Sequence, residues 1–266
     1  MVNDSPIGLL DSGVGGLTVA KDVIRQLPNE KIIYVGDNAR CPYGTRSQEE
    51  VLQFTWEMVQ FLLRHGVKMI IIACNTATVA AFEVIRTRIN IPIIGVVDFG
   101  ARAAIRATQN LSIGVIATAA TITSRAYEQA LLRMESNAKV TSVACQQLVS
   151  VVESGDLDSR ATKKIVTESL MPLKGIDIDT LVLGCTHYPL LSNVIAEVLG
   201  DKVKIISSGE ETASEASAIL QQEQLLRTGV LQEAHEFYTT GSAKLFKQIA
   251  GDLLGVSVQG VNQIKL

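Results

Sequence analysis

Two of the four cysteines hold corresponding places at the ends of two apolar segments. Cys74 follows the apolar residues 70–73 and Cys185 follows residues 181–184, and small hydroxyl or amide side chains come directly after each. In open parallel sheets, ligands bind where strands end and helices begin, and the exposed N–H groups of a helix N-terminus there favour a thiolate. Two such thiols on opposite sides of a ligand supply the two bases that stereoinversion at carbon requires. The repeated placement therefore indicates proton transfer, whereas a single cysteine would indicate a nucleophile.

Several polar residues stand close in sequence to these two thiols. His187 comes two residues after Cys185 and is suited to hold or relay a proton. Asp11 lies in a glycine-rich turn after the first apolar segment. It is interpreted as the partner of a substrate ammonium group or of a nearby thiol, and a plain helix cap is the alternative. Neutral hydrogen-bonding groups at the same strand ends suit carboxylate ligands; they belong to Ser12, Asn75, Thr76 and Thr186.

Motifs and spacing argue against cofactor-dependent chemistry. The glycine-rich turn lacks both the Gly-Lys-Ser/Thr ending of a Walker loop and the third glycine of the dinucleotide fingerprint. No lysine stands at a strand end, where pyridoxal phosphate would need a Schiff base; the nearest basic residues are Lys21, Arg40 and Arg46. Only three histidines and no close cysteine pair argue against a zinc site. The sequence predicts neither a metal nor an organic cofactor, and Cys41 and Cys145 are expected to be structural.

Charge and hydropathy limit the partners. A net charge of -3 and a pI of about 5.7 create no basic field, so nucleic acid is not an expected partner. The start of the sequence shows no basic segment followed by an apolar stretch, as a secretory signal would. No apolar run approaches the roughly 18 residues that a membrane span needs. We expect a cytoplasmic protein whose cysteines are thiols.

The candidate site residues lie in a sequence whose patterns alternate between those of strands and those of helices. Several apolar runs are continuous in Val, Ile and Leu, which is typical of parallel strands covered on both faces. A capping box at Ser47 and Glu50 predicts a helix that Gly66 ends, and Pro189 is expected to open another that Gly200 closes. Strands are expected at residues 7–11, 31–36, 67–73, 91–97, 112–117, 139–145, 179–185 and 202–207.

The chain also carries a weak internal repeat. Residues 7–12 (IGLLDS) resemble residues 113–118 (IGVIAT), and residues 70–76 (IIIACNT) resemble residues 181–187 (LVLGCTH), in the same order. Two similar α/β halves explain this better than chance likeness between hydrophobic strands. We expect two parallel-sheet α/β domains related by pseudo-symmetry, with an active site in the cleft between them. Their bounds are expected at 1–97, with Cys74, and 98–206, with Cys185; residues 207–266 are expected to pack back on the first domain.

At these residues the chain resembles the glutamate racemases of the aspartate/glutamate racemase superfamily. The matching segments occur in the family's order and the resemblance covers essentially the whole chain. The two cysteine segments carry most of its specificity. The matching residues are 10–18 (LDSGVGGLT), 36–37 (GD), 40–44 (RCPYG), 73–78 (ACNTAT) and 183–189 (LGCTHYP).

The resemblance implies a racemisation of L- and D-glutamate by two bases, without metal or pyridoxal phosphate, that supplies D-glutamate for peptidoglycan and so for cell shape. It implies that Cys74 deprotonates D-glutamate with support from Asp11, and that Cys185 deprotonates L-glutamate with support from His187. It gives auxiliary roles to Asp37 and Glu153. It implies that the substrate contacts include Asp11, Ser12, Tyr43, Gly44, Asn75, Thr76, Thr118, Thr121, Thr186 and His187. It also implies a homodimer, and the lack of an N-terminal extension implies no activation by a peptidoglycan precursor.

Two other functions remain open at this stage. One is a racemase or isomerase of another acidic amino acid, such as aspartate. The segments around Tyr43 and His187 favour glutamate over it. The other is a two-domain protein that closes on an amino acid without chemistry, against which the paired cysteines argue.

Overall fold

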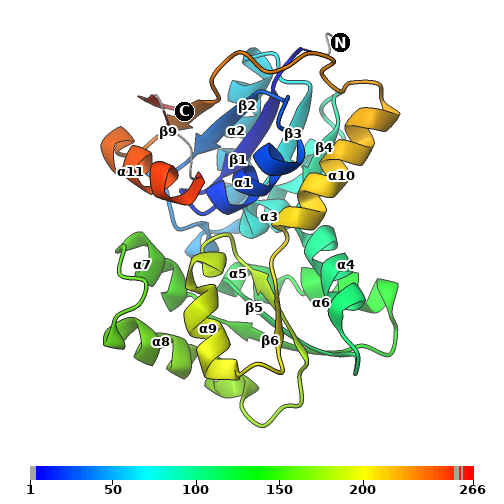
Figure 1. Ribbon diagram of the computed structural model, residues 1–266, viewed down its shortest axis with the longest axis vertical. Coiled ribbons are helices and arrows are strands. Elements are labelled where there is room, and N and C mark those ends of the chain that lie inside the picture. The colour runs from blue at the N-terminus through cyan, green and yellow to red at the C-terminus, as the bar shows by residue number, and fades with distance from the viewer. Residues whose placement is uncertain (1–3, 255–257, 259) are drawn as a thin grey trace. The chain divides into compact units, whose positions relative to one another are not determined.

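The computed structural model describes residues 4–254, 258 and 260–266 of the chain. The described chain forms two compact units (Figure 1). The first unit runs to Val96 and resumes at Gly209, and the second comprises Val97–Ser208. No helix of the described part combines the length and apolarity that crossing a membrane requires.

Sheet A is the core of the first unit. Within the described residues it has six strands in the order β10-β9-β2-β1-β3-β4, and every neighbouring pair is parallel. The apolar runs near residues 7–11, 31–36, 67–73 and 91–97 form strands as predicted. The strands are β1 Ile7–Asp11, β2 Ile32–Gly36, β3 Met69–Ile72, β4 Ile93–Gly95, β9 Glu236–Thr239 and β10 Val261–Gln263.

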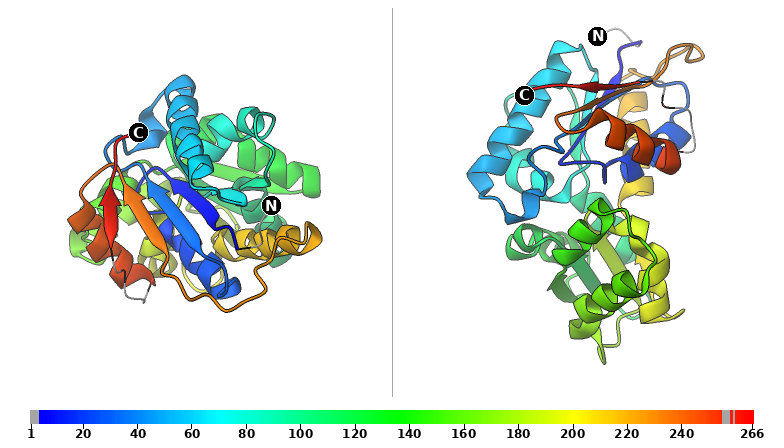
Figure 2. Two further views of the ribbon diagram at one scale, coloured as in Figure 1. Left: turned by 90° about the horizontal axis from the view of Figure 1, so that it is seen from above. Right: turned by 90° about the vertical axis from the view of Figure 1, so that its left-hand side faces the viewer.

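Helices cover both faces of sheet A, as the view from above shows (Figure 2). Alternate strand residues such as Leu10, Val35 and Ile72 pack against α2 (Gln48–Arg64) and α3 (Asn75–Ile85) on one face. On the other face α1 (Leu17–Gln26) packs against α10 and α11. Because both faces are buried, the inner strands β1, β2 and β3 are built almost entirely from buried residues without charge, which explains their unbroken apolar runs.

The C-terminal segment completes the first unit. It forms α10 (Gly209–Gln222), β9, α11 (Ala243–Leu254) and β10, and β9 pairs with β2. Residues 208–227 are one continuous helical pattern in sequence, but α10 ends at Gln222. Strand β10 was not expected from the sequence, because Val261–Gln263 is a short, mostly polar edge segment with no apolar run.

Sheet B of the second unit repeats the central topology of sheet A. In the described chain its four strands run in the order β6-β5-β7-β8, which matches β2-β1-β3-β4, and all pairs are parallel. The two similar sequence pairs fall on equivalent strands, β1 with β5 and β3 with β7. This confirms two parallel-sheet α/β domains. The strands of sheet B are β5 Ser112–Ala117, β6 Lys139–Ala144, β7 Thr180–Gly184 and β8 Lys204–Ile206.

Two groups of helices pack around sheet B (Figure 1). One group is α4 (Val97–Ala107) with α6 (Ala126–Met134), and the other is α7 (Gln147–Glu153), α8 (Arg160–Leu170) and α9 (Ser192–Leu199). Single turns complete the unit: α5 (Ala119–Thr123) and the 3₁₀ segments η2 (Met171–Leu173) and η3 (Tyr188–Leu191). The helix expected from Pro189 to Gly200 is therefore divided into η3 and α9.

Candidate active site

The carboxyl ends of β1, β2 and β3 gather the candidate residues of the first unit. Asp11 is level with Gly36, and Leu10 is level with Ile72. Parallel strands in this register finish at the same edge of the sheet, so the residues just after them become neighbours. These residues are Ser12, Asp37 and Cys74, and the structure buries all of them.

Cys74 is the N-cap residue of α3. Its Sγ accepts a hydrogen bond from the backbone N–H of Ala77 at 3.4 Å, and its thiol lies 3.7 Å from the Ser12 hydroxyl. A backbone N–H at the start of a helix stabilises negative charge on a capping atom. The first-unit thiol therefore occupies the strand-to-helix position that its sequence predicted, in a setting that suits a thiolate. Asn75 and Thr76 follow as the first buried residues of α3.

Asp11 organises the glycine-rich turn before α1. Its Oδ2 accepts hydrogen bonds from the backbone N–H groups of Gly13 at 3.0 Å and Gly16 at 2.9 Å. A Cβ at Gly16 would lie 2.5 Å from the Asp11 Cβ and 2.6 Å from the Tyr34 hydroxyl, so the turn requires glycine there. Asp11 thus holds the turn before α1 rather than the helix itself, since the N-cap of α1 is Gly16 and no side chain caps it. Its role toward a substrate or thiol stays a proposal.

A buried carboxylate, Asp37, connects β2 with the segment η1 (Tyr43–Thr45). Its Oδ2 accepts hydrogen bonds from the Tyr43 hydroxyl at 2.5 Å and from Arg40 Nε at 2.6 Å. Burial, together with the Asp37 charge, raises the pKa of Tyr43 far above its ordinary value, so the phenol stays protonated and donates. Arg40 also pairs with Glu57 at 2.5 Å.

Of the three basic residues nearest the candidate site in sequence, Arg40 alone takes part in the contacts around Asp37 that the structure describes. The side chains of Lys21 and Arg46 are exposed. Gly44 is buried in η1 beside Tyr43.

The carboxyl ends of β5 and β7 gather the candidate residues of the second unit. Ala117 is level with Gly184, which makes Thr118 and Cys185 the residues that follow the two strands at one edge. Thr118 is the N-cap of α5: its hydroxyl accepts from the Thr121 N–H at 3.4 Å and lies 3.0 Å from the Thr121 hydroxyl. Thr186 is also buried at this edge.

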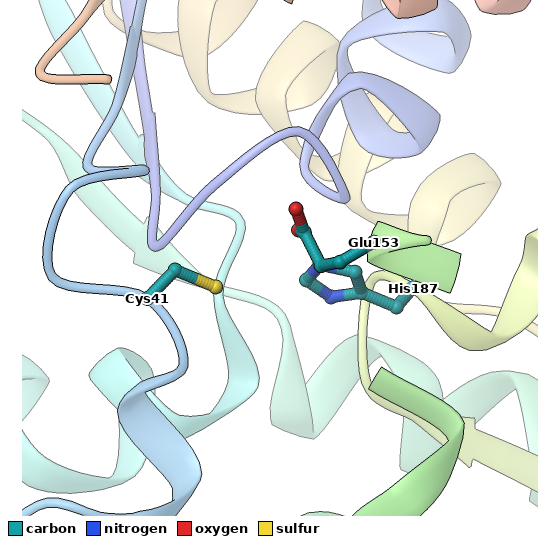
Figure 3. A group of neighbouring side chains, drawn as sticks. All are labelled: Cys41, Glu153 and His187. Carbon is teal, nitrogen blue, oxygen red and sulfur yellow. The ribbon is translucent and has the colours of Figure 1, made fainter. Parts of the chain in front are cut away.

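Three groups that can hold a proton, Cys185, His187 and Glu153, contact one another in turn. Cys185 Sγ lies 3.7 Å from His187 Nδ1. His187 Nε2 lies 2.7 Å from Glu153 Oε1, and Figure 3 shows these two side chains close together. A carboxylate only accepts, so Nε2 is the nitrogen that donates to Glu153, and Nδ1 is the nitrogen that faces the thiol. The imidazole is 2% exposed, and its orientation is therefore set by these partners. This contact between residues 34 positions apart is what the sequence alone did not reveal.

Two buried tyrosines lie near Cys185: Tyr188, which belongs to the matching segment 183–189, and Tyr127, which the sequence did not single out. Burial and the nearby Cys185 raise the pKa of both Tyr127 and Tyr188, and both side chains are buried. A Cβ at Gly184 would lie 2.9 Å from the Tyr127 ring, so the glycine before Cys185 is what admits that ring. No local pattern marks Tyr127, since it lies in α6 near its start.

Cys145 has the features of a structural cysteine. It is buried, its thiol donates to the Ser169 carbonyl at 3.5 Å, and burial raises its pKa to about 12. A thiol with so high a pKa is protonated and unreactive near neutral pH. Cys41 is partly exposed, and neither cysteine follows a strand that is equivalent to β3 or β7.

The class of this protein is defined by two parallel α/β units of the same strand order, each with a buried thiol one or two residues after its third strand along the chain. A family model described as Asp/Glu/hydantoin racemase matches residues 7–216. The chain belongs to this family, and it is a racemase.

Known proteins align with almost the whole chain. The glutamate racemase of Listeria innocua is 54% identical over 260 residues, which cover 98% of this chain and 98% of the relative. A crystal structure of a glutamate racemase isoform from Bacillus anthracis has a TM-score of 0.94 and 50% identity, with 98% of both chains covered. That of the Francisella tularensis glutamate racemase in complex with D-glutamate has a TM-score of 0.91 and 35% identity, and covers 99% of this chain and 98% of that one.

Proposed function

We propose that the protein interconverts L- and D-glutamate with Cys74 and Cys185 as its two bases and without metal or pyridoxal phosphate. The observation that carries this proposal is the placement of the two cysteines. They follow equivalent strands in two sheets of the same order, and each has its own polar partner. The substrate is taken from the relatives, since those that align over 98% of the chain at 52–54% identity are glutamate racemases.

Inversion at the α-carbon needs one group to remove the proton and another to return a proton on the opposite face. We assign the removal from D-glutamate to Cys74 and from L-glutamate to Cys185. In each direction the thiolate of one cysteine takes the α-proton and the thiol of the other gives its proton to the carbanion. After a turnover the thiol and the thiolate have exchanged places, so the reverse reaction starts from the product state.

The partners of the two thiols support different ways of forming the thiolate at Cys74 and at Cys185. The Ala77 N–H donates to Cys74 without exchanging a proton, so Cys74 is stabilised as a thiolate by the start of α3. His187 Nδ1 lies beside the Cys185 thiol, and Nε2 of the same ring contacts Glu153. We assign to His187 the proton of Cys185 when that residue acts as base, and to Glu153 the orientation and stabilisation of the imidazolium.

Substrate binding is assigned to neutral groups at the strand ends. Buried hydroxyl and amide side chains suit the two carboxylates of glutamate, because each group donates one or two hydrogen bonds without the cost of burying a cation. Asp11 is the candidate partner for the ammonium group, and Asp37 acts as an auxiliary group through Tyr43. The residues assigned to binding are Asp11, Ser12, Tyr43, Gly44, Asn75, Thr76, Thr118, Thr121, Thr186 and His187.

The proposed physiological setting is the one that the resemblance to glutamate racemases implies. We assign the enzyme to the cytoplasm as a homodimer that supplies D-glutamate for peptidoglycan, and so for cell wall and cell shape.

The first test is racemisation of L-glutamate in D₂O by the purified protein, with EDTA present and no cofactor added. Circular dichroism follows the loss of optical activity, and NMR follows deuterium entering the α-position. Both changes together are the expected result, since a base that exchanges its proton with solvent returns deuterium to carbon. Neither change, in a reduced and folded sample, would overturn the proposal.

Two further arms separate the alternatives. L-aspartate under the same conditions is expected to react far more slowly than L-glutamate. If aspartate reacts faster than glutamate, aspartate and not glutamate is the substrate. If calorimetry detects glutamate binding while no exchange or inversion occurs, the protein is a binding protein rather than the proposed glutamate racemase.

A further inference from the structure

A turn of the C-terminal segment holds the loop that carries Asp37. Thr240, which follows β9, donates from its hydroxyl to Asp37 Oδ1 at 2.7 Å and accepts from the Ala39 N–H at 3.0 Å. Its own N–H donates to the Gly36 carbonyl at 3.1 Å. These contacts extend the pairing of β2 with β9 beyond the end of both strands. The turn is therefore attached to the residues just after β2 by its backbone and by one side chain.

Two residues of the turn allow it to approach the segment after β2 closely. A Cβ at Gly241 would lie 2.7 Å from the Asn38 Cβ, which is closer than real side chains come. Thr239 is fully buried and donates to Asn38 Oδ1 at 2.8 Å. Glycine at 241 and a hydroxyl at 239 thus allow Thr240 to reach Asp37.

The hydroxyl of Thr240 matters because Asp37 is a fully buried carboxylate. Among the described residues, three side chains donate to it: Tyr43, Arg40 and Thr240. A buried carboxylate is held in place by its donors, and the loss of one frees an oxygen that is costly to leave unpaired. Tyr43 and Arg40 share Oδ2, so Thr240 is the side chain that occupies Oδ1.

We propose that Thr240 is a positioning residue for glutamate binding, acting through Asp37 on Tyr43 and Gly44. The inference rests on the proposed function, in which Tyr43 and Gly44 contact the substrate. With Oδ1 bound by Thr240, the Asp37 carboxylate presents Oδ2 to the Tyr43 hydroxyl in one orientation. The C-terminal segment thereby supports the substrate site through the hydroxyl of Thr240.

The test compares Thr240→Val with Thr240→Ser. Valine keeps the shape of threonine and loses both hydrogen bonds, whereas serine keeps both. A hydrogen bond to a charged group is worth enough that Thr240→Val is expected to raise KM for glutamate about tenfold, or about 1.4 kcal/mol. Its kcat is expected to change less than about threefold, and Thr240→Ser is expected to stay within about twofold of the wild type. Thr228→Val, at an exposed threonine of the same segment, is the matched control and is expected to change neither constant.

A double-mutant cycle tests the route through Asp37. Because Thr240 and Tyr43 donate to the same carboxylate, the KM effects of Thr240→Val and Tyr43→Phe are expected to be less than multiplicative in the double variant. Multiplicative effects would overturn the proposed route. If Thr240→Val does not fold, Thr240→Ala is measured against the same expectations.

The outcomes separate this inference from the proposed function. An active wild type with an unchanged KM in Thr240→Val, or with equal losses in the valine and serine variants, would overturn the inference alone. A wild type without activity on glutamate would overturn the proposed function, and the inference would fall with it. A lowered melting temperature without a KM change would give Thr240 a purely structural role and would also overturn the inference.

Discussion

At the scale of single residues, the two strand-end cysteines have different partners. Cys74 accepts from a backbone N–H of α3, which stabilises a thiolate but takes no proton. Cys185 faces an imidazole nitrogen of His187, to which we assigned the transfer of the thiol proton, and the other ring nitrogen contacts Glu153. Two sheets of the same strand order thus have thiols after equivalent strands, and the polar partners of these thiols differ.

This difference makes a prediction for Cys74→Ser and Cys185→Ser. Each variant is expected to lose at least about a hundredfold in racemisation, because a serine hydroxyl is a poor base at neutral pH. The remaining cysteine still removes and returns a proton on its own face. In D₂O, Cys185→Ser is therefore expected to exchange the α-proton of D-glutamate without inversion, and Cys74→Ser that of L-glutamate.

NMR of the α-proton, combined with chiral analysis of the product, measures both effects in one sample. Cys145→Ser is the control, since Cys145 is buried and held protonated by its raised pKa. Exchange of both enantiomers by one single variant would show that the assignment of one cysteine to each face is wrong.

At the scale of elements, a carboxylate fixes the start of β7. Asp179 precedes the strand and accepts from the Gln109 and Asn110 N–H groups at 2.6 and 2.8 Å and from the Thr108 hydroxyl at 2.6 Å. The turn between α4 and β5 is thereby joined to the strand that carries Cys185. Burial raises the pKa of Asp179, but these hydrogen bonds outweigh it and lower the pKa to about 2.

We predict that Asp179→Asn lowers the free energy of unfolding by about 1 kcal/mol at neutral pH, because the amide loses the charged acceptor. The pKa shift alone corresponds to about 2.4 kcal/mol, but solvent screening at this partly exposed site reduces it. A carboxyl with a depressed pKa in the folded state stabilises the fold above the unfolded value of 3.8. The stabilisation is then lost as the pH falls toward about 2.

Urea unfolding followed by circular dichroism, repeated from about pH 7 down to the lowest pH at which the protein folds, measures this difference. The gap between the wild type and Asp179→Asn is expected to narrow steadily below about pH 4. A gap that stays constant with pH would mean that the carboxylate charge contributes nothing.

At the scale of the whole molecule, the chain returns to its first unit after completing the second. A buried ion pair, Lys68 Nζ to Glu30 Oε2 at 2.6 Å, lies where the returning segment joins. Lys68 also donates to the Leu225 carbonyl at 2.7 Å, and the Arg227 N–H donates to Glu30 Oε1 at 2.8 Å. Both charged side chains are almost fully buried, so the pair and its backbone partners form one unit of contacts.

We predict that Lys68→Met lowers the free energy of unfolding of the first unit by about 3–5 kcal/mol, because it leaves the Glu30 carboxylate buried without its cation. The double variant Lys68→Met with Glu30→Gln is expected to recover most of this loss, since no buried charge remains. Fluorescence of Trp56 in α2, the single tryptophan of the sequence, reports the unfolding of this unit in urea.

Lys164→Met is the control, because Lys164 is exposed and its pairing with Glu168 at 3.8 Å is worth less than about 0.5 kcal/mol. A double variant that is as unstable as Lys68→Met would contradict the account of an uncompensated charge.

The sequence alone determined the eight apolar strands of the two sheets and the duplication, but not the mostly polar strand β10. Strands buried on both faces show as unbroken apolar runs, and the polar residue that ends such a run marks the edge where ligands bind. Cys74, Cys185, Asp11 and His187 were found in this way. The comparisons bear out the fold class and the family that the matching segments indicated. These signals are local, because strand periodicity, caps and turns act over a few residues.

Tertiary structure alone decided which distant residues meet. Glu153 reaches His187 across 34 positions, and Thr240 reaches Asp37 across 203. Neither contact follows from local patterns. The first depends on how α7 packs near η3, and the second on β9 joining the free edge of β2. Burial makes these contacts important, because a carboxylate or imidazole that is removed from water depends on its few neighbours for its charge and its orientation.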